Sequence, residues 1–188
     1  SEPNHLFNIS VLGFQSYFVP NEVIEAFDKM YFDLIRLGVL RAGIEKCEPY
    51  IRDADIFSFD MSAIRYANAP GQLFPSPNGL TGEEACALMR YAGLSNGLKT
   101  AGIYEYNPDF DERGQTALLI AQMFWYYVEG LGIRRSEHPL KQQDDFIKYR
   151  TVIQNHQYEI VFYKSKFTDK WWMEIPNPRT NKENTLPI

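Results

Sequence analysis

The stretch IFSFDMSAIR, residues 56–65, decides the fold that we expect for this chain. Residues 56–59 are mostly apolar, Asp60 ends the run with a carboxylate, and the chain then turns polar. A short apolar run of this kind is typical of a strand that is covered on both faces in a parallel sheet. We therefore expect a buried strand whose last residue, Asp60, lies at the carboxyl end of the sheet.

Strand and helix patterns alternate on both sides of this stretch. Further strand-like runs cover residues 6–13, 32–38 and 98–105, and helical patterns cover residues 21–32, 44–54, 81–97 and 114–132. This alternation predicts an α/β fold, a three-layer α/β/α arrangement around a mainly parallel sheet. The pattern over residues 114–132 is so apolar that we expect this helix to be buried.

The charge of the chain changes sign near residue 133. Residues 1–133 carry 9 basic and 17 acidic side chains, net −8, whereas residues 134–188 carry 10 and 7, net +3. We expect residues 1–133 to form the α/β domain and residues 134–188 to form an appended segment. Its residues 158–175 are typical of an antiparallel β-hairpin, and the last dozen residues are typical of a loose tail.

Two acidic residues follow apolar runs at predicted strand ends, Asp60 and Glu105. In open parallel sheets, ligands bind beyond the carboxyl ends of the strands. This placement makes both carboxylates candidates for a functional site. The alternative is that each caps a strand or the turn that follows it.

Ser62 stands two positions after Asp60, where a second metal-binding group is expected. If the strand continues, both side chains point to the same side of the chain. Two carboxylates at this spacing would face one divalent cation, but a serine hydroxyl brings no charge. Ser62 is therefore a weak metal ligand or a holder of a ligating water.

The residues around Asp60 resemble the C-terminal signature of the arginase/agmatinase/formimidoylglutamase family, the ureohydrolases. That signature reads S-F-D-x-D, then a loop with A-P-G, then G-G-L-T at the start of a helix, then a strand that ends in E-V-N-P. The matching positions in this chain are Ser58, Phe59, Asp60, Ala69, Pro70, Gly71, Gly79, Leu80, Thr81, Glu105, Asn107 and Pro108. Within the family, the stretch is most similar to formimidoylglutamases.

The resemblance implies the C-terminal half of an arginase-like fold and a hydrolase that cleaves C–N bonds in linear amidines or guanidines. It implies a binuclear Mn²⁺ centre in which Asp60 bridges the metals and Ser62 lies beside them. Glu105 is expected to face the amidinium group of the substrate, with Asn68 and Ser62 also in the substrate site. A homo-oligomer is expected for the full-length protein.

This chain also departs from the family pattern. Ser62 replaces the second aspartate, Arg65 replaces an acidic residue of the loop, and the upstream motifs G-G-D-H and D-A-H-x-D do not occur. The three histidines, His5, His138 and His156, lie in no such motif, so we expect surface or structural roles for them. We therefore expect half of a longer hydrolase that alone binds manganese weakly and is inactive. The alternative is a non-catalytic binding or assembly module with the same fold.

The predicted hairpin mixes basic and aromatic residues: Lys164, Lys166, Phe167, Lys170, Trp171 and Trp172. Such interleaving can bind single-stranded nucleic acid by stacking. Hairpin aromatics more often pack against a sheet or a subunit, and the acidic body disfavours phosphate contacts. We therefore expect no nucleic-acid partner.

Compartment and membrane association follow from simple features. No apolar run approaches the roughly 20 residues that a bilayer span needs, and the first residues do not resemble a signal peptide. Cys47 and Cys86 form no cysteine motif, which favours two buried thiols in a reducing compartment. We therefore expect a cytoplasmic protein that does not bind membranes.

Overall fold

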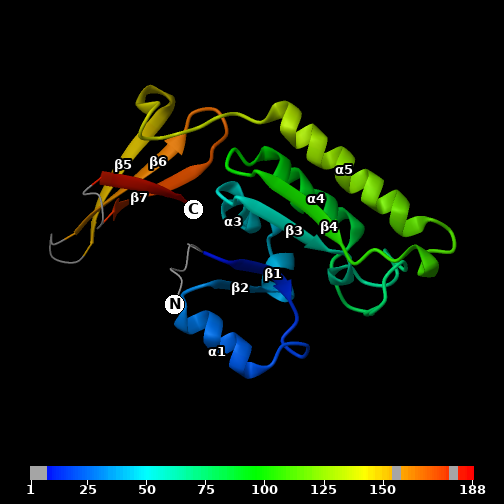
Figure 1. The fold of residues 1–188 in the computed structure, drawn as a ribbon. Coiled ribbons are helices and arrows are strands. Elements are labelled where there is room, and N and C mark those ends of the chain that lie inside the picture. The colour runs from blue at the N-terminus through cyan, green and yellow to red at the C-terminus, as the bar shows by residue number, and fades with distance from the viewer. Residues whose placement is uncertain (1–7, 154–157, 178–181) are drawn as a thin grey trace, which may run out of the picture. The chain divides into compact units, whose positions relative to one another are not determined.

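The computed structural model of the chain describes residues 8–153, 158–177 and 182–188 (Figure 1). The chain divides into two compact units, Ser1–Ile133 and Arg134–Ile188. Each unit has its own hydrophobic cluster of buried side chains. No helix among the described residues is long and apolar enough to span a bilayer.

The first unit alternates strands and helices, as the sequence pattern predicts. Its elements are β1 (Ser10–Phe14), α1 (Asn21–Lys29), β2 (Asp33–Arg36), α2 (Leu37–Arg41), η1 (Ile44–Cys47), α3 (Glu48–Arg52), β3 (Ile56–Asp60), η2 (Met61–Ala63), α4 (Gly82–Leu94), β4 (Thr100–Tyr104), η3 (Pro108–Phe110) and α5 (Gln115–Ile133). The elements marked η are short 3₁₀ turns.

The four strands of the first unit form two parallel pairs, β1 with β2 and β3 with β4. The predicted parallel direction is therefore confirmed. The predicted single sheet is not seen, because in the described part of the chain the two pairs share no hydrogen-bonded edge. Strand β3 was expected to be covered on both faces, and this is wrong: Phe59 is buried, but Ile56 is 71% exposed.

Helix α4 begins at a capping box, which the three-residue spacing of Thr81 and Glu84 in the sequence indicates. The hydroxyl of Thr81 accepts from the backbone N–H of Glu84, and the Glu84 carboxylate accepts from the N–H of Thr81. These bonds satisfy amides that have no partner inside the helix. Helix α4 then crosses α5 where Gly93 meets Gly130. A Cβ on Gly93 would lie 2.2 Å from the carbonyl oxygen of Tyr127, so only glycine allows this approach.

Helix α5 is not buried all around, so the prediction of a buried helix is wrong. Its buried residues are Thr116, Leu119, Met123 and Gly130. On other faces Trp125 is 63% exposed and Val128 is 61% exposed. The helix packs on α4 through one stripe, and in the described part of the chain its remaining apolar side chains stay largely accessible.

The second unit is a four-stranded antiparallel sheet with the strand order β5-β6-β7-β8. The short turn η4 (Gln143–Asp145) precedes its strands, which are β5 (Phe146–Ile153), β6 (Tyr158–Ser165), β7 (Trp171–Asn177) and β8 (Lys182–Pro187). The predicted hairpin corresponds to β6 and β7, but it lies inside a larger sheet. The predicted loose tail is wrong for residues 182–187, because they pair with β7.

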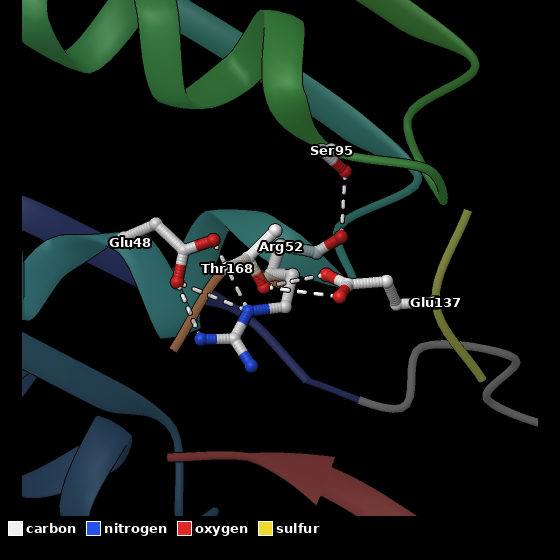
Figure 2. A network of polar contacts seen from close by, with 5 residues as sticks. All are labelled: Glu48, Arg52, Ser95, Glu137 and Thr168. Atoms are coloured by element: carbon white, nitrogen blue, oxygen red, sulfur yellow. Dashed lines mark hydrogen bonds and ion pairs between the residues drawn. The ribbon is translucent and has the colours of Figure 1, made fainter. Parts of the chain in front are cut away.

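Each unit contains a compact polar cluster (Figure 2). In the first, Arg52 Nη2 lies 2.5 Å from Glu48 Oε2, and the Ser95 hydroxyl donates to the Arg52 carbonyl at 2.6 Å. In the second, the Glu137 carboxylate accepts from the Thr168 hydroxyl at 2.8 Å. Buried charges need such partners, because an unpaired one is costly. These clusters therefore fix local structure within each unit.

The two cysteines are buried and unpaired, as expected for structural thiols. Burial raises the pKa of the Cys47 thiol to about 11, and the nearby Glu45 carboxylate adds to this shift. A thiol with such a pKa is almost entirely protonated at neutral pH and reacts poorly.

Candidate functional site

The register of β3 and β4 brings the two candidate carboxylates, Asp60 and Glu105, to the carboxyl end of this parallel pair, which is here called the strand edge. Asp60 is the last residue of β3 and pairs with Tyr104, the last residue of β4. Glu105 follows Tyr104 directly. Both acids are therefore at the carboxyl end of the same parallel pair, and both are exposed. This is the position at which α/β sheets bind ligands.

Asp60 also caps the turn that follows it. Its Oδ1 accepts a hydrogen bond from the backbone N–H of Ser62 at 2.8 Å. This bond orients the carboxylate and starts η2. Ser62 thus contacts Asp60 through its backbone amide. This capping bond uses Oδ1 of Asp60, so it does not prevent the second carboxylate oxygen from binding a ligand.

Glu105 has a backbone conformation that is rare for its residue type. Its φ is 63°, in the left-handed region that favours glycine. A non-glycine residue in this region is strained and keeps the conformation only where its surroundings hold it. Strain of this kind is frequent at functional sites.

Asn68 lies in the loop that follows β3, and its side chain is bonded within that loop. Its Oδ1 accepts from Arg65 Nε at 2.5 Å, and its carbonyl accepts from Gln115 Nε2 at 3.0 Å. Arg65 thus orients Asn68 at the place where the family carries an acid. The side chain of Gln115 anchors the loop to the first turn of α5.

The loop over residues 64–80 is held by its own hydrogen bonds. Ile64 and Leu80 form a parallel bridge, and the buried Gln72 donates from Nε2 to the carbonyls of Ile64 and Ala69. A Cβ on Gly79 would lie 2.5 Å from the backbone nitrogen of Arg65, so the closure of the loop requires glycine there. The long, proline-containing loop therefore has a defined conformation that its own hydrogen bonds hold.

A cleft of about 480 Å³ opens beside this loop. Tyr66 and Pro70 of the loop and Phe110 of η3 contribute to its lining. The lining contains neither Asp60 nor Glu105. The cleft is thus separate from the strand edge.

The described residues do not fit a binuclear metal centre. Among them, no group of three or more His, Cys, Asp or Glu side chains is close enough to hold a metal ion. His138 is exposed, whereas His5 and His156 lie outside the described residues. A two-metal site needs several anionic or imidazole ligands, and Asp60 with Ser62 does not supply them.

One structural residue near the site was missed from the sequence: Asp111. Its buried carboxylate accepts from the backbone N–H of Thr116 at 3.0 Å and from that of Ala117 at 2.9 Å, in the first turn of α5. Burial raises the pKa of the Asp111 carboxyl, but these hydrogen bonds outweigh it and lower the pKa below its usual value. An aspartate just before an apolar helix is a capping signal, so local sequence contained this clue.

The sequence model of the arginase family matches residues 6–129, and the chain belongs to that family. The resemblance seen in the motifs around Asp60 is thereby confirmed.

The similar curated proteins are formimidoylglutamases. The one from Geobacillus kaustophilus is 36% identical over 94 residues, which is 49% of this chain and 29% of that protein. The one from Vibrio parahaemolyticus is 33% identical over 85 residues, which is 44% of this chain and 25% of that protein. The matches thus span less than a third of these relatives.

Solved structures show the same fold. Trypanosoma cruzi formiminoglutamase with Mn²⁺ matches with a TM-score of 0.60 at 22% identity, over 66% of this chain and 44% of that chain. Arginase from Bacillus caldovelox matches with a TM-score of 0.52 at 21% identity, over 57% of this chain and 39% of that chain. The arginase-like α/β fold of the first unit follows from these matches.

Proposed function

We propose that this chain is the C-terminal part of a manganese-dependent hydrolase of the formimidoylglutamase type, which cleaves C–N bonds in linear amidines. The observation that carries the proposal is the shared strand edge of Asp60 and Glu105 in a chain of the arginase family. The curated relatives are formimidoylglutamases, which supports this substrate class over guanidines.

Glu105 is proposed to bind the amidinium group of the substrate. A carboxylate and an amidinium form charge-assisted hydrogen bonds, which are stronger than neutral ones. The exposure of Glu105 beyond β4 leaves it accessible to a ligand. Its left-handed backbone fixes the direction in which the side chain leaves the strand.

Asp60 is proposed to be the metal ligand of this chain, with Ser62 beside it. Ser62 and Asn68 are proposed to contact the substrate. Manganese, when bound in the full-length protein, would activate the water that attacks the amidine carbon. Because the described residues do not form a two-metal site, the proposal requires further ligands from residues other than those that the structure describes.

The test is an assay of the full-length protein with formimidoylglutamate and manganese. We expect turnover in the wild type and a loss of at least about 100-fold in kcat/KM for Glu105→Gln, since a transition-state contact to a charged group is removed. The 188-residue chain alone is expected to be inactive. Full activity of the Glu105→Gln variant would contradict the proposed role.

A second candidate function is a non-catalytic module that keeps the fold and has lost the metals. Two observations favour it: Ser62 stands where the family has an aspartate, and Arg65 bonds Asn68 where the family has an acid. Turnover by the wild-type full-length protein would exclude this candidate. Absence of both turnover and manganese binding would support it.

For the full-length protein we also propose a cytoplasmic homo-oligomer with a small-molecule substrate, and no nucleic-acid or membrane partner. The acidic charge of residues 1–133 supports the absence of nucleic acid. Sedimentation velocity of the full-length protein tests the oligomer, and a gel shift with a single-stranded oligonucleotide tests the β6–β7 hairpin. A monomer, or a clear shift, would contradict the respective part.

A further inference from the structure

The loop after β3 and the segment after β4 are joined by a closed circuit of hydrogen bonds. Its members, here called the Asp111 ring, are Gly71, Tyr106, Asn107, Asp111 and Thr116. The five residues come from three segments: Gly71 from the loop over residues 64–80, Tyr106, Asn107 and Asp111 from the segment that follows Glu105, and Thr116 from the first turn of α5.

The first half of the ring runs from Asp111 to the loop. The Asp111 carboxylate accepts from the backbone N–H of Thr116 at 3.0 Å. The Thr116 hydroxyl in turn accepts from the backbone N–H of Gly71 at 2.8 Å. All three residues are buried, so each of these bonds is shielded from water.

The second half runs from Gly71 back to Asp111. The Gly71 carbonyl accepts from the backbone N–H of Asn107 at 2.9 Å. Tyr106, the neighbour of Asn107, donates its hydroxyl to Asp111 Oδ2 at 3.3 Å. The two residues that directly follow Glu105 are therefore both held by the ring.

The fit at Gly71 is tight. A Cβ on this residue would lie 2.8 Å from Asp111 Cβ and 3.0 Å from Thr116 Oγ1. The glycine of the A-P-G motif is thus needed for the backbone of the loop to reach α5. The same residue joins the loop to α5 through the hydrogen bond from its N–H to the Thr116 hydroxyl.

We propose that Asp111 is a positioning residue for Glu105: through the ring it holds residues 106 and 107 and so keeps Glu105 in its left-handed conformation at the strand edge. This inference rests on the proposed function of Glu105. Asp111 itself is buried beneath the first turn of α5, so its action is indirect. Strained residues at functional sites persist because their surroundings over-determine them, and the ring supplies that constraint here.

A double-mutant cycle in the full-length protein with manganese tests the proposal. Asp111→Asn places an amide N–H₂ against the N–H of Thr116 or Ala117, so one bond is lost while the shape stays the same. We expect kcat/KM to fall at least about 10-fold, because small misplacements of a binding group reduce rates strongly. The matched control Glu112→Gln removes an exposed acid one residue further and should change kcat/KM by less than about 2-fold.

The same Asp111→Asn change is then made in a Glu105→Gln background. If Asp111 acts through Glu105, it should cost less than about 2-fold there, because the group that it positions is already disabled. Losses that simply multiply would overturn the proposal, since a purely structural role is additive. Tyr106→Phe, which removes a single hydroxyl, repeats the cycle with a smaller effect if Asp111→Asn does not fold.

A readout independent of activity separates this inference from the proposed function. Amide hydrogen exchange at Gly71 and Asn107 should accelerate at least about 10-fold in Asp111→Asn relative to Glu112→Gln, because both amides donate within the ring. Unchanged exchange at both amides would overturn the ring. If the wild type proves inactive but exchange responds as expected, the proposed function fails and the coupling between the two segments stands.

Discussion

The carboxylates of the strand edge and of the Asp111 ring differ in their burial and in the number of hydrogen bonds that they accept. Asp60 and Glu105 are exposed, and Asp60 accepts one backbone hydrogen bond from its own turn. Asp111 is buried and accepts from Thr116, Ala117 and Tyr106. The ring is complete among the described residues, whereas these residues supply no cluster of metal-binding side chains at the strand edge. The described residues thus form a complete Asp111 ring, which supports the candidate site, but only part of the candidate site at the strand edge.

The largest effect is expected where the ring is tightest. Gly71→Ala places a Cβ 2.8 Å from Asp111 Cβ, and overpacking of this kind costs about 1–3 kcal/mol. Chemical denaturation of the 188-residue chain should show this loss in the free energy of unfolding. A loss below about 0.5 kcal/mol would show that the loop and α5 adjust freely, and the ring would then not be rigid.

Thr116→Val should have the next largest effect. It keeps the shape of the side chain but removes the acceptor of the Gly71 amide, which is then buried without a partner. Such a group costs about 1–3 kcal/mol. The control is Thr100→Val at an exposed position of β4, where little change is expected. Equal free energies of unfolding for Thr116→Val and Thr100→Val would contradict a ring in which the buried Gly71 amide depends on the Thr116 hydroxyl.

The dependence of stability on acid pH tests the contribution of the Asp111 carboxylate to the ring. The hydrogen bonds of Asp111 lower its pKa in the folded state, so its ionised form stabilises the fold above the unfolded pKa of roughly 3.9. This contribution is lost as the pH falls through the lower folded pKa. We therefore expect the stability gap between wild type and Asp111→Asn to shrink below about pH 4. A gap that is constant from pH 7 to pH 2.5 would contradict the lowered pKa.

The smallest effect is expected at the edge, and with the opposite sign. Glu105→Gly removes the Cβ that strains the left-handed backbone and should stabilise the chain by up to about 1 kcal/mol. The matched change Asp109→Gly, at an exposed residue of η3, should not stabilise. If Glu105→Gly destabilises the chain, the Glu105 side chain makes a stabilising contribution larger than its backbone strain, which would contradict the prediction.

Much of the fold could be predicted from sequence because the deciding signals are local. The capping box of Thr81 and Glu84 defines the start of α4, and the alternation of patterns gives the parallel direction of β3 and β4. The motif residues around Asp60 gave the family. The predictions that α5 and β3 are buried on all sides were wrong, because burial depends on which other elements pack against them, and the periodicity of a segment does not reveal its packing partners.

The pairing of β5 with β6 and of β8 with β7 was not predicted from the sequence, since antiparallel partners are chosen by non-local contacts. The Asp111 ring was missed because it joins positions 71, 106, 107, 111 and 116, which no single pattern spans. Strand-end placement of Asp60 and Glu105 was predicted well, because the register of a parallel pair follows from its apolar runs.

The most direct test of this account is the manganese content of the full-length protein and of the 188-residue chain, measured by mass spectrometry after equilibration with Mn²⁺ and removal of free metal. We predict two equivalents per full-length chain, as two-metal hydrolases bind, and well under one for the 188-residue chain. Two equivalents on the 188-residue chain would contradict the account, because the strand edge of Asp60 would then hold a complete metal site by itself.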